Sequence, residues 1–334
     1  MVFEDNLKPY ELKNFEIKTL QIKSESLKEN PLGDSFVRNI PVLVPKKQGG
    51  YNCVFHLSGF TSNAQKNFNF KSYEQNLIEE IDEWTMSESI SPKIYVFVDA
   101  WTSWGGSQFI NSEGCGKYED YIVKELVPFV EKSLKSIDYS VADKVVLGGS
   151  SGGYGALHLC SKFPEVFPHC LAIAPDCDFE VSLKHEVYQG FADIMNQDGP
   201  LEILNKIKGF DIKTNQRSFH TMVNVLAMAA CYSKIDENNM PILPLEKEGG
   251  FDQDLWSKWL EKDPVHFLPK RLDAVKSLKT IFLSVGEFDQ FLLQYGVRKI
   301  RKLFKENEVG FIYEEFKGNH FDIGTRRKKA LSLV

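Results

Sequence analysis

The sequence predicts an α/β fold with a mixed, mostly parallel central sheet and helices on both faces of the sheet. Two observations predict it. Residues 15–22 and 36–44 alternate apolar and polar side chains, which is typical of antiparallel strands with one solvated face. After residue 50, short runs that are apolar throughout are separated by stretches of helical periodicity. This second pattern indicates β-α-β units whose parallel strands are buried on both faces.

The buried strands are expected at five apolar runs, namely residues 53–57, 94–98, 145–147, 170–174 and 280–285. Between the second and third runs, residues 118–135 repeat apolar side chains at intervals of three and four. That spacing predicts an amphipathic helix packed on the sheet.

One long segment, residues 179–270, separates two of these strands. A structureless loop of that length would be improbable, and residues 221–230 favour a helix. We expect a largely helical insertion ahead of the strand 280–285. It could form a cap over the active site or simply extend the helical layer. The chain 1–334 is expected to form a single domain around it.

The composition is that of a soluble globular protein, with 43% hydrophobic and 26% charged residues and a net charge of −6. A broad basic face for nucleic acid is not expected. We expect no secretory leader, and no apolar stretch approaches the ~18 residues that span a bilayer. The six cysteines lack metal-ligand spacing, so we expect free thiols in a reducing cytoplasm.

The strongest motif is Gly149-Ser150-Ser151-Gly152-Gly153, which matches G-x-S-x-G with Ser151 at its centre. The strand 144–147 precedes it and a helix is expected to begin at residue 154. A strand, a tight turn and a helix expose a nucleophilic serine above a sheet. Glycines at both ends of the motif avoid a collision in the turn, and the Gly152 N–H would face the oxyanion. A phosphate-binding loop is disfavoured, because no Gly-Lys-Ser/Thr follows.

The catalytic base should be His320. A serine hydrolase of this kind places its residues in the order serine, acid, histidine along the chain. Of the seven histidines, His320 alone lies on a loop after the last expected strand, residues 311–316. The other six precede the motif, follow it too closely or fall in the insertion.

The acid should lie on the loop after the strand 280–285. Glu287 and Asp289 both occupy that loop. We favour Asp289 because it is further round the turn toward His320, while Glu287 stays open as the alternative.

The second oxyanion donor is expected on the loop after the strand 53–57. Gly59 allows the backbone to approach the substrate, and the Phe60 N–H is the expected donor. Trp101 and Trp104, after the strand 94–98, could form a wall of the substrate pocket or could pack in the core. Tyr154, just after the motif, is also expected in the pocket.

With these segments assembled, the chain resembles the putative-esterase family of α/β-hydrolases, which includes esterase D (S-formylglutathione hydrolase) and enterochelin esterase-like enzymes. The resemblance rests on residues 151–157, 57–61, 105–109 with 118–121, and 318–322. It implies the α/β-hydrolase fold, hydrolysis of carboxylic esters without a metal or other cofactor, and the triad Ser151, Asp289 and His320.

We therefore expect a cytoplasmic serine esterase that hydrolyses a small carboxylic ester or thioester through an acyl-enzyme on Ser151. Its partner would be a small-molecule ester, with no nucleic acid or membrane, and the chain could form a homo-oligomer. An acyltransferase of the same fold is the alternative, since an alcohol can replace water. A non-catalytic binding protein would lack a member of the triad, and no member is missing.

Overall fold

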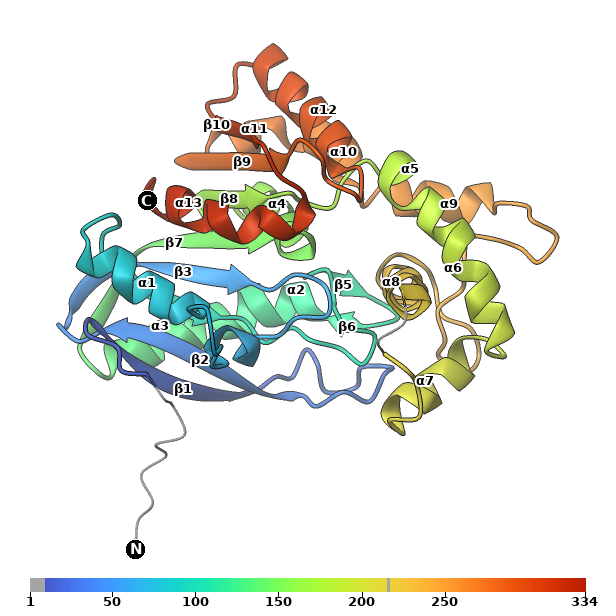
Figure 1. Cartoon of the computed structure of the whole chain (residues 1–334), viewed down its shortest axis with the longest axis horizontal. Coiled ribbons are helices and arrows are strands. Elements are labelled where there is room, and N and C mark those ends of the chain that lie inside the picture. The colour runs from blue at the N-terminus through green and yellow to red at the C-terminus, as the bar shows by residue number, and fades with distance from the viewer. Residues whose placement is uncertain (1–9, 215–216) are drawn as a thin grey trace, which may run out of the picture.

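In the computed structural model, which describes residues 10–214 and 217–334, eight strands form one sheet in the order β1-β2-β4-β3-β7-β8-β9-β10 (Figure 1). Strands β1 and β2 are antiparallel, β2 is antiparallel to β4, and the remaining neighbours are parallel. The expected mixed, mostly parallel sheet is therefore confirmed. Its strands are β1 (Phe15–Lys23), β2 (Val37–Pro45), β3 (Gly49–Leu57), β4 (Ile94–Phe97), β7 (Tyr139–Gly149), β8 (His169–Ile173), β9 (Thr280–Gly286) and β10 (Ile312–Phe316). A separate pair joins β5 (Asn111–Ser112) to β6 (Gly116–Lys117).

The sheet separates two hydrophobic cores, because successive side chains of a strand point to opposite faces. In β3, Val54 belongs to the smaller core, and the next residue, Phe55, belongs to the larger one. Helices α1 (Leu77–Met86) and α13 (Arg327–Leu331) cover the smaller core. The larger core lies under α3 (Val127–Lys135), α4 (Ser151–Lys162) and α12 (Leu293–Glu306).

The helix expected over residues 118–135 is present but not uniform. It begins as α2 (Tyr118–Asp120), widens into a π-helical turn η2 (Tyr121–Leu126) and continues as α3. Pro128, at the start of α3, has no N–H, so one α-helical hydrogen bond is missing at this point. The wider turn is compatible with that loss.

The segment 179–270 is largely helical and gathers on one side of the molecule (Figure 1). The residues expected to be helical, 221–230, lie within α8, and Leu226 and Ala227 are fully buried in the larger core. Whether the segment acts as a cap stays a prediction. Its helices are α5 (Phe179–Ser182), α6 (Lys184–Asn196), α7 (Pro200–Lys208), α8 (Arg217–Tyr232), α9 (Gln253–Leu260) and α10 (Pro264–Phe267). Shorter elements complete the fold: η1 (Gln65–Phe68), η3 (Leu268–Arg271), α11 (Leu272–Lys276) and η4 (His320–Arg326).

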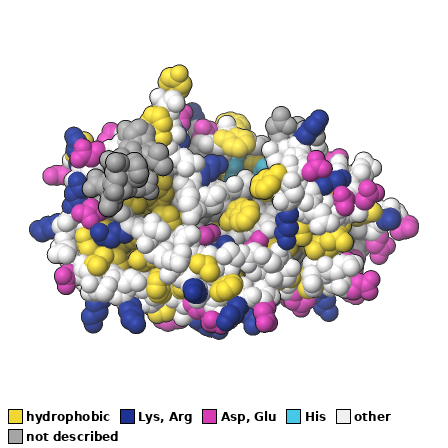
Figure 2. Space-filling view, turned by 90° about the horizontal axis from the view of Figure 1, so that it is seen from below, with side chains coloured by type: hydrophobic (Ala, Val, Ile, Leu, Met, Phe, Trp, Pro, Cys, Tyr) yellow, Lys and Arg dark blue, Asp and Glu magenta, His cyan; other side chains and the backbone are white. Residues whose placement is uncertain are grey.

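Charged side chains of both signs are intermingled on the face shown in Figure 2. Hydrophobic side chains form separate small groups there, and a histidine is visible in a recess. Among the described residues, no helix has both the length and the apolar character needed to cross a membrane.

Candidate active site

A tight turn joins β7 to α4 and holds Ser150 in an unusual backbone conformation. β7 ends at Gly149 and α4 begins at Ser151, which leaves Ser150 between them with φ +57° and ψ −125°. A non-glycine residue with positive φ is strained, and the surrounding structure must hold it. Here the Ser150 N–H donates to the Ile173 carbonyl of β8 at 3.0 Å, and the Ser150 carbonyl accepts from the Tyr154 N–H at 2.9 Å.

The glycines that this turn requires are Gly148 and Gly152. A Cβ on Gly148 would lie 2.2 Å from the Gly152 carbonyl carbon, and one on Gly152 would lie 2.2 Å from the Leu57 carbonyl oxygen. Neither position has room for a side chain. Because they stand two residues before and two residues after Ser150, the turn is centred on that serine.

Asp289 and His320 meet beside the same turn. His320 opens η4, and its Nδ1 lies 2.7 Å from Asp289 Oδ2, while its Nε2 lies 3.0 Å from Ser150 Oγ. Asp289 is 1% exposed, and its other oxygen accepts the Phe291 N–H at 3.0 Å. With Nδ1 protonated and donating to the carboxylate, Nε2 is free to accept the serine proton. Glu287, the alternative acid, makes no hydrogen bond to His320 among the described residues.

The structure brings His320 to Ser150, whereas the sequence motif placed Ser151 in that role. Ser151 is the first residue of α4, and its Oγ donates instead to Asp176 Oδ2 at 2.9 Å. Two overlapping matches to G-x-S-x-G cause the difference, because residues 148–152 also fit the pattern with Ser150 at the centre. The backbone conformation, and not the residue type, distinguishes the two serines.

Asp176 is an acidic residue of the site that the sequence analysis missed. It follows β8, its Oδ1 lies 3.2 Å from Ser150 Oγ, and its Oδ2 accepts from Gln108 Nε2 at 3.1 Å as well as from Ser151. Burial raises the pKa of its carboxyl group, while the hydrogen bonds from Gln108 and Ser151 oppose the rise. Its place just past a parallel strand, like that of Asp289, is the sequence signal that could have indicated it.

The loop after β3 approaches the turn from the other side. A Cβ on Gly59 would lie 3.4 Å from the Gly149 carbonyl oxygen and 3.7 Å from Ser150 Cβ. The hydrogen bonds of the described residues leave the Phe60 N–H without an acceptor. Since Ser150 occupies the centre of the turn, the first backbone N–H after it belongs to Ser151. The expected donor Gly152 is one residue further into α4 and packs on the end of β3.

The family comparison covers most of the chain. The model of the family described as "Putative esterase" matches residues 35–322. The chain belongs to the putative esterase family. It is a carboxylic-ester hydrolase. None of the curated proteins matches this chain in sequence.

Solved structures share the fold of this esterase at low sequence identity. A ferulic acid esterase aligns with a TM-score of 0.58 at 15% identity, covering 96% of this chain and 97% of that chain. FphF, a fluorophosphonate-binding serine hydrolase of Staphylococcus aureus, aligns at 0.56 and 14% identity, covering 96% and 98%. An S-formylglutathione hydrolase of Agrobacterium tumefaciens aligns at 0.54 and 16% identity, covering 96% and 94%. The fold is thus the α/β-hydrolase fold.

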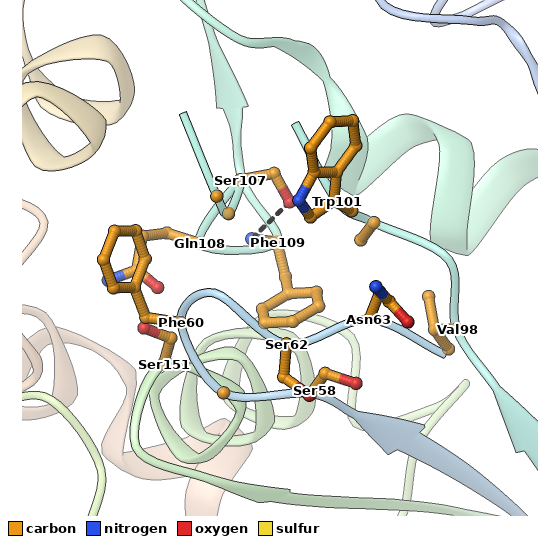
Figure 3. Close-up of a pocket in the computed structure, with 14 residues that line it drawn as sticks. Ser58, Phe60, Ser62, Asn63, Val98, Trp101, Ser107, Gln108, Phe109 and Ser151 are labelled. Atoms are coloured by element: carbon orange, nitrogen blue, oxygen red, sulfur yellow. Dashed lines mark hydrogen bonds between the residues drawn. The ribbon is translucent and has the colours of Figure 1, made fainter. Parts of the chain in front are cut away.

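A small pocket of the esterase lies next to the turn (Figure 3). Phe60, Gln108 and Ser151 stand at one end of it, and Trp101 stands at the other. Gly59 also lines it. Trp101 thus lines a pocket, and its role in a substrate pocket stays a prediction.

Trp104 and Tyr154 do not line this pocket, nor do they line a second, larger cavity that lies over Ser150 and His320. Both are fully buried, and the Tyr154 hydroxyl donates to the Lys262 carbonyl at 3.0 Å. Tyr154 lies on the side of α4 that faces the larger core, where its ring stacks on that of His158. Their expected place in the substrate pocket is therefore wrong, and both are core residues.

A larger cavity of about 810 Å³ opens over Ser150 and His320. The segment 179–270 contributes Glu186 and Asn224 to its lining, and the loop after β9 contributes Phe291. Burial, together with the charge of Asp176, raises the pKa of Glu186 to about 7, against the opposing hydrogen bond from Asn224. The sequence analysis did not find these residues.

Proposed function

We propose that this protein is a serine esterase whose nucleophile is Ser150, with His320 as general base and Asp289 as the residue that orients it. One observation carries the proposal. A continuous chain of hydrogen bonds runs from the Asp289 carboxylate through the imidazole to Ser150 Oγ, and ends at the strained turn above the sheet.

Acylation begins with attack of Ser150 Oγ on the ester carbonyl carbon. His320 Nε2 accepts the serine proton as the new C–O bond forms, and Asp289 stabilises the imidazolium. The N–H groups of Ser151 and Phe60 would donate to the oxyanion, since both border the pocket next to the turn.

Collapse of the tetrahedral intermediate expels an alcohol or a thiol, which takes the proton from His320. Water then attacks the acyl-enzyme carbonyl and gives a proton to His320. The second collapse releases the carboxylic acid and returns the proton to Ser150. His320 carries each proton between Ser150, the leaving group and water in this sequence.

The substrate is a small carboxylic ester or thioester. The 810 Å³ cavity has the size of sites that enclose small molecules, which supports this class. A panel of p-nitrophenyl esters of increasing acyl length, with S-formylglutathione as the thioester, would establish the preferred acyl group.

The two serines provide the test of the mechanism. Ser150→Ala should lower kcat for p-nitrophenyl acetate by roughly 10³-fold or more, as loss of a nucleophile does elsewhere. Ser151→Ala should keep most of the activity, because its backbone N–H remains. An active Ser150→Ala variant beside an inactive, folded Ser151→Ala variant would return the nucleophile to Ser151.

A further inference from the structure

Two carboxylates face the cavity above Ser150, the partly exposed Asp176 and the buried Glu186, and no cation among the described residues pairs with either of them. Within the described part of the chain, the polar contacts of Asp176 are all with neutral groups, the two serines and Gln108. Glu186 is 7% exposed and accepts from Asn224 Nδ2 at 2.5 Å through Oε2. Among the described residues, no donor reaches its Oε1. Buried charges in proteins are normally paired, so the Glu186 carboxylate lacks an expected partner within residues 10–214 and 217–334.

Basic residues also line the same cavity. Lys66, Lys71 and Arg327 line it together with the residues of α1. The Lys71 ammonium pairs with Glu74 at 3.1 Å. None of the three forms an ion pair with Asp176 or Glu186 within the described part of the chain. The cavity therefore has an acidic end that includes the catalytic serine.

Aromatic rings surround this acidic end. Phe291 packs against the His320 ring with centroids 4.7 Å apart, and His220 packs against Phe291 at 6.3 Å and against Phe60 at 5.6 Å. All four side chains line the cavity. Aromatic faces attract ammonium groups through their ring electrons, and the attraction grows when water is excluded.

We infer that the natural substrates are esters that carry a positively charged ammonium group, which Asp176 and Glu186 bind at the acidic end of the cavity. The inference rests on the proposed function and names its substrate class. An ammonium group placed there would stabilise both ionised carboxylates and lie against the aromatic rings. An ester that bears a carboxylate in the same place would be repelled.

The experiment compares cationic esters with neutral esters of the same shape. On the alcohol side, acetylcholine is compared with 3,3-dimethylbutyl acetate. On the acyl side, p-nitrophenyl 4-(trimethylammonio)butyrate is compared with p-nitrophenyl 5,5-dimethylhexanoate. Each kcat/KM is divided by the rate constant for hydroxide hydrolysis, which removes intrinsic reactivity. We expect the cationic ester to be favoured about tenfold or more in at least one pair.

Three variants assign that preference to the two carboxylates. Asp176→Asn and Glu186→Gln should each reduce the cationic-to-neutral ratio at least threefold, whatever their effect on the absolute rates. Glu74→Gln removes one negative charge from the same cavity without touching either carboxylate, so its ratio should equal that of the unmodified protein.

A ratio near one in both pairs, or a ratio that neither Asp176→Asn nor Glu186→Gln changes, would overturn the inference. Turnover of the neutral p-nitrophenyl ester in the same assay would leave the proposed esterase function standing. Failure to hydrolyse any of the four esters would contradict the inference and the proposed function together.

Discussion

Ser150 and Ser151 carry the same side chain and both hydroxyls contact Asp176, yet only the Ser150 hydroxyl also reaches His320. Ser150 has positive φ and reaches His320, while Ser151 is helical and donates to Asp176. Reactivity at this site therefore depends on the turn that holds the residue. Position also distinguishes the two candidate acids. Among the described residues, the Asp289 carboxylate, and not that of Glu287, hydrogen-bonds to Nδ1 of the His320 imidazole.

The role of Asp289 can be measured against that of Glu287. Asp289→Asn should lower kcat by roughly 10⁴-fold, because an amide stabilises the wrong imidazole tautomer and cannot balance the imidazolium charge. Glu287→Gln removes a carboxylate two residues away and should stay within about threefold of the unmodified protein. The opposite order of the two variants in steady-state kinetics would show that Glu287 is the acid.

Chain order predicted that an acid on the loop after β9, Asp289 or Glu287, would meet His320, and the position of Asp289 further round the turn favoured it. It could not select between two adjacent serines, since the motif fits both. It also could not find Asp176 or Glu186. Their proximity to the nucleophile depends on the path of the loop after β8 and on how α6 packs, and neither is encoded in a short pattern.

At the scale of elements, the turn between β7 and α4 determines the position of Ser150, the proposed nucleophile. β7 lies between β3 and β8, so its end is surrounded by backbone on both sides. The close approach of Gly148 to Gly152, and of Gly152 to Leu57, leaves no room for a Cβ. The apolar runs predicted these strands well. The π-helical turn η2 could not be predicted, because the spacing of its apolar residues also fits a regular α-helix.

Gly148→Ala tests the steric requirement of this turn. Its Cβ would overlap the backbone of Gly152, so the turn must shift and the serine with it. We expect kcat/KM to fall more than tenfold and the free energy of unfolding to fall by about 1–3 kcal/mol, the usual cost of overpacking. Gly310→Ala is the matched control, because a Cβ there meets nothing within 4 Å. Equal activity of both variants would show that the turn tolerates a side chain.

At the scale of the whole molecule, the segment 179–270 contributes to the larger core and also supplies part of the cavity over Ser150 and His320. α6 brings Glu186 and α8 brings Asn224, and the two side chains hydrogen-bond to each other beside the cavity. The sequence predicted a helical insertion here. Its contribution to the cavity depends on long-range packing of α6 against α8, which local periodicity does not reveal.

Glu186 should make stability depend on pH. Its pKa is about 7 in the folded protein and 4.5 in an unfolded chain, so the folded state keeps the proton up to a higher pH than the unfolded chain does. Stability should therefore fall as pH rises from about 4.5 to about 7, by an amount on the order of 3 kcal/mol. Glu186→Gln removes this contribution, so the variant should gain thermal stability over the unmodified protein at pH 8.5 but not at pH 4.5.

Thermal unfolding at the two pH values checks the expectation. Glu74→Gln, an exposed carboxylate with a lysine partner, serves as the control and should leave the pH dependence unchanged. If Glu186→Gln had the same pH dependence as the unmodified protein, the Glu186 carboxyl would titrate normally, and its burial would not cost free energy.

The most direct test of the central claim, that Ser150 is the nucleophile, is covalent labelling followed by intact mass spectrometry. A fluorophosphonate forms a stable adduct with an activated serine. The unmodified protein and Ser151→Ala should each gain the mass of one adduct, and folded Ser150→Ala should gain none. Labelling of Ser150→Ala with loss of labelling in Ser151→Ala would contradict the assignment.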